Sequence, residues 1–421
     1  MLKKIDSFSR NILVVFSGTA LASFLNLLCQ LLIAHRLKPE DFAVFNTLLS
    51  IFMIISAPFL TLQSGIIKYI SEFNARGEYE KIKKFISGIS IRVTTFSFFV
   101  LIIFYIFSNS IMLKLQVPSI AAMHILTALI FLSCITPVFS GSIQGMEFFN
   151  WFAAASVFGG LLKLALVALF IKLGFNISGA LSSFLITTAI TLGVYYFVLK
   201  RAISVKDTGC LPHAVFKINY KSFFSYLFPV AISTFCFMVL VSSDMVLIKR
   251  YFSPADAGEY SLAQMVGKIF LFLPGAISIV MFPRTSGLHA KNMDTAHTLK
   301  KSLLYAFILC AAAAICYNFF PSLLLRILTG KTTESAVILG RMFSFSMSLF
   351  SLLFIVISYF LSKKDLRFVK WLVAFTILQI GLIILFHANL FMVQSVLCAN
   401  VFLLFCIHLA LFFKHGYLLK K

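Results

Sequence analysis

The sequence predicts an all-α, polytopic membrane protein with about 12 transmembrane helices. Hydrophobic residues make up 60% of the 421-residue chain, whereas soluble proteins carry about 45–50%. Because a helix needs roughly 20 apolar residues to cross a bilayer, this composition supplies about a dozen spans and leaves little for a water-soluble domain. Charged residues are only 12% of the chain, yet they sum to +22. The few charges are therefore mostly positive, and their positions carry information on topology and function.

Twelve apolar runs separated by polar breaks are the expected spans. They lie at residues 11–33, 42–62, 86–107, 119–141, 150–173, 177–199, 223–248, 257–281, 302–320, 334–361, 371–386 and 392–413. The first run is too long for the core of a cleaved signal peptide, so we expect it to be the first span. The eleventh run is the shortest.

The loop charges predict that both chain ends lie in the cytoplasm, because cytoplasmic loops hold an excess of Lys and Arg. With the N-terminus inside, 25 basic residues fall on the inner side. The outer side holds eight: Arg36, Lys38, Lys114, Lys172, Lys249, Arg250, Arg326 and Lys331. Since the basic residues form short clusters between apolar runs, and not one soluble face, we expect no nucleic-acid partner.

A short internal repeat predicts two halves. Residues 35–45 align with residues 250–260 at an offset of 215, and each copy follows the first span of its half. Parallel repeats are typical of transporters in which the substrate path lies between the halves. We therefore expect an N-terminal six-helix lobe at 1–200, a cytoplasmic linker at 201–222 and a C-terminal six-helix lobe at 223–421.

Several segments resemble polysaccharide transporters. They are residues 37–46, 66–73, 76–78, 81–84, 144–148, 243–254, 258–261 and 263–283. In these segments the chain is similar to the O-antigen and capsule repeat-unit flippases of the multidrug/oligosaccharidyl-lipid/polysaccharide (MOP) exporter superfamily.

The resemblance implies a two-lobed, MATE-like transporter in a bacterial inner membrane. Its expected cargo is undecaprenyl-pyrophosphate-linked oligosaccharide, which moves from the inner to the outer leaflet. No enzymatic activity and no cofactor are expected, and a coupling ion, if used, would be H⁺ or Na⁺. The expected partners are this cargo, membrane lipids, and polysaccharide polymerase or chain-length proteins.

Four charged residues are expected at membrane depth. They are Lys163, Lys268, Arg341 and Asp244. A charge at the centre of a spanning helix costs about 2.5–3.5 kcal/mol on insertion scales, so we expect the three basic residues to face a polar interior or a partner. For Arg341 the alternative is that its side chain snorkels to the interface. The surplus of positive charge favours an anionic cargo, because Arg and Lys bind phosphate oxygens well.

One polar helix face is expected around Lys268. Tyr260, Gln264 and Lys268 recur at a spacing of four residues, which places them on one side of a helix. Gln264 is therefore included with the predicted cavity residues. For Asp244 a structural alternative stays open, namely an ion pair with Lys249, Arg250 or Lys268.

Two further sets of polar residues are weaker candidates. The expected cavity lining includes Asn26, Gln30 and Asn46, for which helix packing is the alternative. The residues expected to collect an anionic headgroup at the inner rim are Lys68, Arg92 and Arg284, for which ordinary topology signalling is the alternative.

Three rival functions remain. An ion-coupled drug or small-molecule antiporter of the same superfamily would need buried carboxylates, and the first six expected spans contain no well-buried Asp or Glu. The related lipid II flippases usually have fourteen spans. A membrane polysaccharide polymerase or ligase would expose its chemistry in a long outer loop, whereas every expected outer loop has about 12 residues or fewer.

Overall fold

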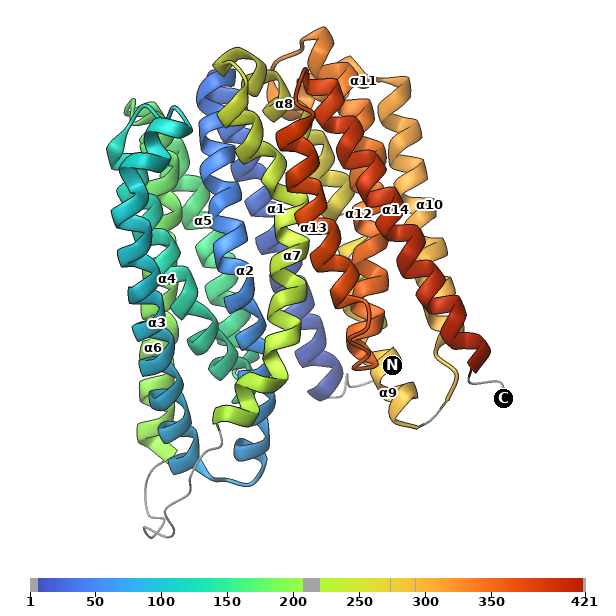
Figure 1. Cartoon of the computed structure of the whole chain (residues 1–421). Coiled ribbons are helices and arrows are strands. Elements are labelled where there is room, and N and C mark those ends of the chain that lie inside the picture. Colours follow the sequence, from blue (N-terminus) through green and yellow to red (C-terminus); the bar gives the residue numbers. More distant parts are fainter. Residues whose placement is uncertain (1–6, 207–219, 273, 292, 419–421) are drawn as a thin grey trace, which may run out of the picture. The chain divides into compact units, whose positions relative to one another are not determined.

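The computed structural model describes residues 7–206, 220–272, 274–291 and 293–418, and it is helical in nearly all of them (Figure 1). These residues form fourteen α-helices: α1 (Ser7–Arg36), α2 (Pro39–Ala75), α3 (Tyr79–Lys114), α4 (Ile120–Gly145), α5 (Phe149–Lys172), α6 (Asn176–Lys206), α7 (Tyr220–Tyr251), α8 (Pro254–Phe272), α9 (Gly275–Ala290), α10 (Ala296–Phe319), α11 (Pro321–Thr329), α12 (Glu334–Ser362), α13 (Val369–Leu385) and α14 (Leu390–Leu418).

The predicted fold class, an all-α polytopic membrane protein, is confirmed. By length and composition, ten of the described helices are able to cross a membrane: α1 to α7, α10, α12 and α14. The shorter apolar helix α13 coincides with the eleventh expected span, which was also expected to be the shortest.

The expected eighth span is wrong as a single helix. The chain instead forms α8 up to Phe272 and α9 from Gly275, with Pro274 at the start of the second helix. Proline has no N–H to donate and its ring clashes with the preceding turn, so a break at this point follows from its chemistry. The short helix α11 was also not expected; it ends at Gly330, whose left-handed backbone (φ 71°) suits glycine.

The expected inner loop between residues 62 and 86 is also wrong, because α2 and α3 continue through most of it. These helices have 37 and 36 residues, or about 55 Å each at 1.5 Å per residue, which exceeds the roughly 30 Å of a hydrocarbon core. The extension of α2 buries Ile66, Ile70 and Phe73 at helical spacing. The chain reverses at Gly77, which has a φ of +70°.

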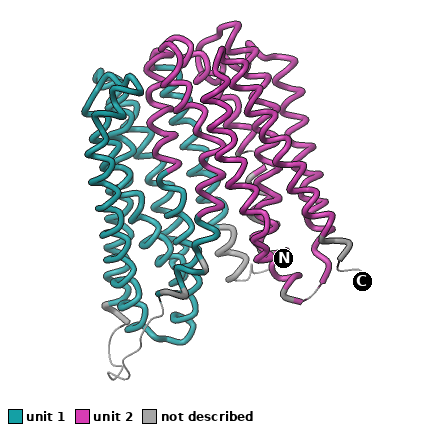
Figure 2. Tube along the Cα trace, viewed as in Figure 1, with its two compact units in different colours: residues 1–36, 55–231 teal, residues 37–54, 232–421 magenta. Residues whose placement is uncertain are grey.

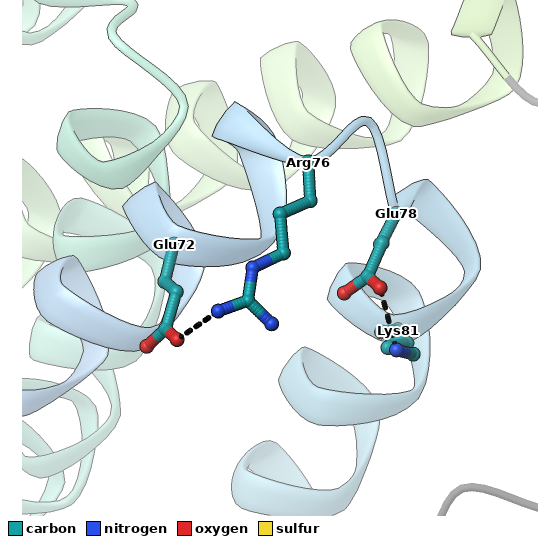
Figure 3. A network of polar contacts seen from close by, with 4 residues as sticks. All are labelled: Glu72, Arg76, Glu78 and Lys81. Carbon is teal, nitrogen blue, oxygen red and sulfur yellow. Dashed lines mark hydrogen bonds and ion pairs between the residues drawn. The ribbon is translucent and has the colours of Figure 1, made fainter.

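Ion pairs accompany this reversal (Figure 3). Arg76 Nη2 lies 2.7 Å from Glu72 Oε1, and Lys81 Nζ lies 2.6 Å from Glu78 Oε1. The Arg76–Glu72 pair is exposed, and exposed pairs contribute only about 0–1 kcal/mol each, whereas the Lys81–Glu78 pair is half-buried. Their main effect here is to offset part of the positive charge on the extended ends of α2 and α3.

The described chain divides into two compact units (Figure 2). Unit 1 comprises residues 1–36 and 55–231, and unit 2 comprises residues 37–54 and 232–421. Two helices change unit along their length: α2 after Ile54 and α7 after Ala231. The lobes expected at 1–200 and 223–421 stay predictions, and most of the expected linker at 201–222 lies outside the described residues.

In unit 1, α1 packs closely against α5 through small residues. A Cβ built on Gly18 would lie 2.6 Å from Ala153 Cβ and 3.1 Å from its Cα. One built on Gly160 would lie 3.0 Å from Leu25 Cβ. Small residues let helix backbones approach in a membrane, where van der Waals packing drives association. The small side chains of α1 and α5 therefore permit this packing.

In unit 2, α12 is the central helix. It packs against α8, α9, α10 and α14, and most of its side chains are buried. The start of α2 also belongs to this unit, and Gly258 of α8 is within close contact of Pro39.

The two copies of the repeat meet inside unit 2. Asn46 Nδ2 donates to Ser261 Oγ at 2.6 Å, and these residues are 215 positions apart, which is the offset of the repeat. The Gly258 backbone also approaches Pro39. The starts of α2 and α8, which carry the two copies of the repeat, therefore lie next to each other within unit 2.

The packing of α1 on α5 predicts a position-dependent effect of alanine. Gly18→Ala forces the two helices apart and is expected to lower stability by about 1–3 kcal/mol, the usual cost of overpacking. Gly193→Ala on α6 is the matched control, because no atom lies within 4 Å of the added Cβ. The measurement is the thermal unfolding midpoint of both variants in one detergent; equal midpoints would contradict the packing argument.

Candidate functional site: a cationic cavity and a buried polar network

Unit 1 contains a polar cavity of about 380 Å³. Its lining comes from α1, α2, α4, α5 and α6 and consists of Thr19, Ala22, Ser23, Asn26, Gln63, Thr136, Ser140, Phe152, Ala155, Ser156, Gly159, Gly160, Lys163, Thr187, Thr188, Thr191 and Tyr195. Lys163 is the one charged residue in this lining, and none of the lining residues is Asp or Glu. The cavity is therefore cationic and rich in hydroxyl groups.

Lys163 is held by two neighbours of unlike kind. Its Nζ donates to Asn26 Oδ1 at 2.8 Å, and it lies 4.4 Å from the centroid of the Phe184 ring. Asn26 is itself oriented, because its Nδ2 donates to Ala22 O at 2.9 Å. Both neighbours are neutral, so they fix the position of the Lys163 ammonium without neutralising its positive charge.

Two glycines on α5 explain why Lys163 reaches the cavity. The Gly160 backbone lies against Leu25 of α1, and the Gly159 backbone lies against Thr191 of α6. With both neighbouring helices this close, the residue one turn further along α5 projects between them. That residue is Lys163, which the sequence predicts as a cavity residue.

A buried network in unit 2 surrounds Asp244, which is 0% exposed. Tyr260 Oη donates to Asp244 Oδ2 at 2.9 Å, and Gln264 Nε2 lies 3.2 Å from the same oxygen. Tyr260 Oη also lies 3.2 Å from Gln394 Oε1, and Gln394 Nε2 donates to Ser346 Oγ at 2.7 Å. Neutral donors on α8 thus hold the carboxylate of α7.

Lys268 lies on the same face of α8 but takes a different partner. Its Nζ donates to Asn46 Oδ1 at 2.8 Å, and Asn46 Nδ2 in turn donates to Ser261 Oγ. The structure thus places the predicted residues Asp244, Gln264, Lys268 and Asn46 together in unit 2. The hydrogen-bonding partners of Asp244 are Tyr260 and Gln264, whereas the ammonium of Lys268 binds the amide of Asn46.

A second group of charges lies at the start of α2, also within unit 2. Lys249 is 2% exposed and interacts electrostatically with Asp41 and Glu40. Lys331 Nζ donates to Leu37 O. Partial burial lowers the pKa of Lys331, while Glu40 and Asp41 oppose that shift. These contacts attach the beginning of α2 to unit 2.

The other predicted residues lie apart from these two groups. Gln30 of α1 is half-buried and outside the cavity lining, and Arg341 is exposed on α12. Lys68 of α2 and Arg284 of α9 are exposed. Arg92 of α3 donates to Gly88 O at 2.9 Å, and its guanidinium carbon lies 3.8 Å from the Tyr220 ring centroid. Their proposed roles in binding stay predictions.

The sequence interpretation missed the hydroxyl groups of α4 and α6. Thr136 and Ser140 line the cavity from α4, and Thr187, Thr191 and Tyr195 line it from α6. Both sets follow the four-residue spacing that identified the polar face of α8. The same periodicity, applied to the fourth and sixth spans, would have found them.

No metal-binding group emerges in the part of the chain that the structure describes, where no three His, Cys, Asp or Glu side chains gather.

Comparison with known proteins identifies the family. Residues 8–289, about two thirds of the chain, match the family described as polysaccharide biosynthesis protein. The chain belongs to this family. The family resemblance predicted from the sequence is therefore confirmed, and the protein is a membrane transporter.

Two curated relatives agree with this assignment. A putative O-antigen transporter of Shigella flexneri is 22% identical over 309 residues, which cover 72% of each protein. An uncharacterised membrane protein of Methanocaldococcus jannaschii is 24% identical over 349 residues, which cover 77% of this chain and 67% of the relative.

Solved structures show the fold. An inward-facing MATE-family multidrug transporter of the MOP superfamily superposes with a TM-score of 0.75 at 16% identity, over 96% of this chain and 97% of the other. The lipid II flippase MurJ superposes with a TM-score of 0.69 at 14% identity, over 96% of this chain and 87% of the other. The MATE-like fold that the resemblance implied is therefore confirmed.

The Lys268–Asn46 contact predicts that removing the amide is worse than removing both partners. Asn46→Leu leaves the ammonium and the Ser261 hydroxyl without their partner and is expected to cost about 1–3 kcal/mol. Adding Lys268→Met removes the buried ammonium that has lost its hydrogen-bond acceptor, so the double variant should be more stable than Asn46→Leu alone. Thermal unfolding midpoints of the two single variants and the double variant measure this coupling. Losses that simply add would contradict it.

Proposed function

We propose that this protein is a flippase for undecaprenyl-pyrophosphate-linked oligosaccharide. It moves an O-antigen, capsule or exopolysaccharide repeat unit from the inner to the outer leaflet of a bacterial inner membrane by alternating access, with both chain ends in the cytoplasm. Membership of the polysaccharide biosynthesis family and similarity to a putative O-antigen transporter support a glycan cargo. The observation that carries the proposal is Lys163 in a cavity lined by no carboxylate.

The amide partner leaves the Lys163 charge available to a cargo. An ammonium has three donors and no acceptor, and Asn26 Oδ1 accepts one of its hydrogens. The remaining donors are able to bind anionic oxygens, and charge-assisted hydrogen bonds of this kind are roughly twice as strong as neutral ones. A negatively charged lipid-linked saccharide is the cargo that gains most from this arrangement.

The drug antiporter is less well supported. A cationic substrate entering the unit 1 cavity would meet Lys163 and no opposing carboxylate. The buried Asp244 of unit 2 already accepts hydrogen bonds from Tyr260 and Gln264. The charge of the cavity thus favours export of an anion over export of a cation.

The membrane potential acts in the same direction. An inside-negative potential favours outward movement of a negative headgroup by about 2.3 kcal/mol per elementary charge per 100 mV. A lysine that fully neutralised the cargo would cancel this contribution for one charge. Any H⁺ or Na⁺ coupling would add to it.

Replacing Lys163 tests the proposal. Lys163→Ala removes the charged group of the cavity and should reduce surface polysaccharide about tenfold or more in a flippase-null strain, the equivalent of at least 1.4 kcal/mol. Lys163→Arg keeps the charge and should retain part of the activity. The measurement is polysaccharide output at matched membrane expression.

Lys172→Ala is the matched control, because this exposed lysine ends α5 and lies outside the cavity lining. It should restore polysaccharide as well as the unaltered protein. Normal output from Lys163→Ala would contradict the role of the cationic cavity.

A further inference from the structure

We propose that the hairpin formed by the end of α2 and the start of α3, residues 66–92 of unit 1, binds anionic phospholipid headgroups of the adjacent membrane leaflet. Lys68 and Lys84 are the central cations of this surface. The ligand is a resident lipid of the membrane and not the transported cargo. From the proposed function the inference takes the orientation alone, which makes this leaflet the inner one.

The exposed apolar side chains of α3 mark the thickness of the membrane around unit 1. They run from Ile91, which is 64% exposed, to Leu113, which is 74% exposed. At 1.5 Å per residue this stretch is about 33 Å long, close to the roughly 30 Å of a hydrocarbon core. The residues of α3 that precede Ile91 therefore lie at the level of the lipid headgroups or beyond them.

Two aromatic pairs relate the levels of α2 and α3. The ring centroids of Phe59 and Phe96 lie 5.9 Å apart. Those of Tyr69 and Phe85 lie 5.4 Å apart, and these two rings stack. Phe96 belongs to the exposed apolar stretch of α3, whereas Phe85 precedes that stretch. The Tyr69–Phe85 pair therefore lies outside the hydrocarbon core on both helices.

Lys68 and Lys84 lie at one level, because each directly precedes a member of the Tyr69–Phe85 pair. Both lysines are exposed. Lys84 is seven residues before Ile91, or about 10 Å, and a lysine stem allows its ammonium to snorkel back toward the lipid phosphates. The headgroup layer, about 5–7 Å thick on each side of the core, is thus within reach of both lysines.

The sign of the charge changes with distance from the membrane. On α2, Glu72 lies one helical turn beyond Lys68. On α3, Glu80 lies one turn beyond Lys84, and its Oε2 is 3.8 Å from Lys84 Nζ. The tip carries the ion pairs of Glu72 and Glu78 (Figure 3). An anionic lipid surface therefore meets the two lysines first, whereas a soluble polyanion that approaches the tip meets both signs.

The hairpin keeps a positive surplus and a fixed shape. It has six basic and three acidic residues, which leaves a net charge of +3. Its inward face is packed, since Ile70, Ile82 and Phe85 are 0% exposed. Phe85 also lies parallel to the Tyr220 ring at the start of α7, with centroids 6.3 Å apart. Topology signalling needs only a surplus of positive charge on one side, whereas a rigid surface with lysines at one level suits the binding of headgroups.

Lipid binding to purified protein in a neutral detergent tests the inference. Phosphatidylglycerol and phosphatidylcholine with the same acyl chains are titrated separately, and bound lipid is counted by native mass spectrometry. The unaltered protein should bind phosphatidylglycerol about tenfold more tightly, because each lysine near an anionic surface contributes roughly fivefold in affinity. Lys68→Gln with Lys84→Gln should remove most of this preference, and Lys68→Arg with Lys84→Arg should keep it.

Lys114→Gln with Lys172→Gln is the matched control, because it also removes two exposed lysines of unit 1. Lys114 ends α3, at the opposite end of that helix from the hairpin, and Lys172 ends α5. This variant should keep the preference for phosphatidylglycerol. An equal loss in the two double variants would show that lysines at any helix end have the same effect, and would overturn the inference.

Measurements on the unaltered protein make the test independent of how the variants fold. The preference should weaken between 0.1 and 1 M salt, because the Debye length shortens from about 10 Å to about 3 Å. Polyglutamate at equal charge should leave bound phosphatidylglycerol in place. No preference, a preference that salt does not change, or displacement by polyglutamate, which would indicate an acidic protein partner, would each contradict the inference.

The lipid site and the transport function fail separately. Lys163→Ala should leave the preference for phosphatidylglycerol unchanged, and its loss in this variant would place the lipid in the unit 1 cavity and overturn the inference. A protein that binds phosphatidylglycerol through the hairpin but moves no lipid-linked saccharide would refute the proposed function alone. A protein that moves the saccharide without any lipid preference would refute the inference alone.

Discussion

Two lysines in this protein are held by asparagine side chains, and the polar interior of each unit depends on this choice of partner. Lys163 donates to Asn26 within unit 1, and Lys268 donates to Asn46 within unit 2. A carboxylate in the place of Asn26 would have neutralised Lys163, whereas the amide oxygen accepts one hydrogen bond and leaves the positive charge uncancelled. Lys268 also interacts electrostatically with the buried Asp244. The membrane cost of a charged group is thus reduced by local hydrogen bonding while its ability to attract an anion is kept. The same logic, with the sign reversed, applies to Asp244, whose carboxylate is held by the neutral donors Tyr260 and Gln264.

Helix packing makes these contacts possible. Gly18 and Gly160 bring α1 and α5 together, and Lys163 and Asn26 meet across the same pair of helices. In unit 2 the beginnings of α2 and α8 meet at Asn46 and Ser261, which directly follow the two copies of the internal repeat and are separated by its offset of 215. Both α2 and α7 continue from one unit into the other, and each has a proline, Pro58 or Pro229, within a few residues of that change. Because proline removes a backbone hydrogen bond, these are the points at which the two shared helices bend most easily.

Apolar run length predicted the fold class. The cost of isolated charges singled out Lys163, which lines the unit 1 cavity, and Asp244 and Lys268, which lie in unit 2. They did not predict that α2 and α3 continue beyond the spans, because polar residues on one face hide the buried Ile66, Ile70 and Phe73 on the other. The break at Pro274 is visible in the sequence, but a proline in a spanning helix is often tolerated, so hydropathy alone gave one helix.

Contacts between helices were the hardest to predict. Lys163 and Asn26 are 137 residues apart and Lys268 and Asn46 are 222 apart, and no local pattern connects them. The hydroxyl-bearing faces of α4 and α6 follow a four-residue period. Neutral Ser and Thr are nevertheless a weaker signal of a cavity in an apolar run than a charged residue is, because they cost less to bury in a membrane.

The central claim is that the uncancelled charge of Lys163, among the hydroxyl groups of unit 1, receives the anionic part of a lipid-linked saccharide. The most direct measurement is an experimental structure of the protein in a lipid nanodisc with a lipid-linked acidic oligosaccharide. We expect density for part of the cargo in the unit 1 cavity, with an anionic oxygen within hydrogen-bond distance of Lys163 Nζ. Cargo density that leaves this cavity empty, with Lys163 still donating only to Asn26, would contradict the account.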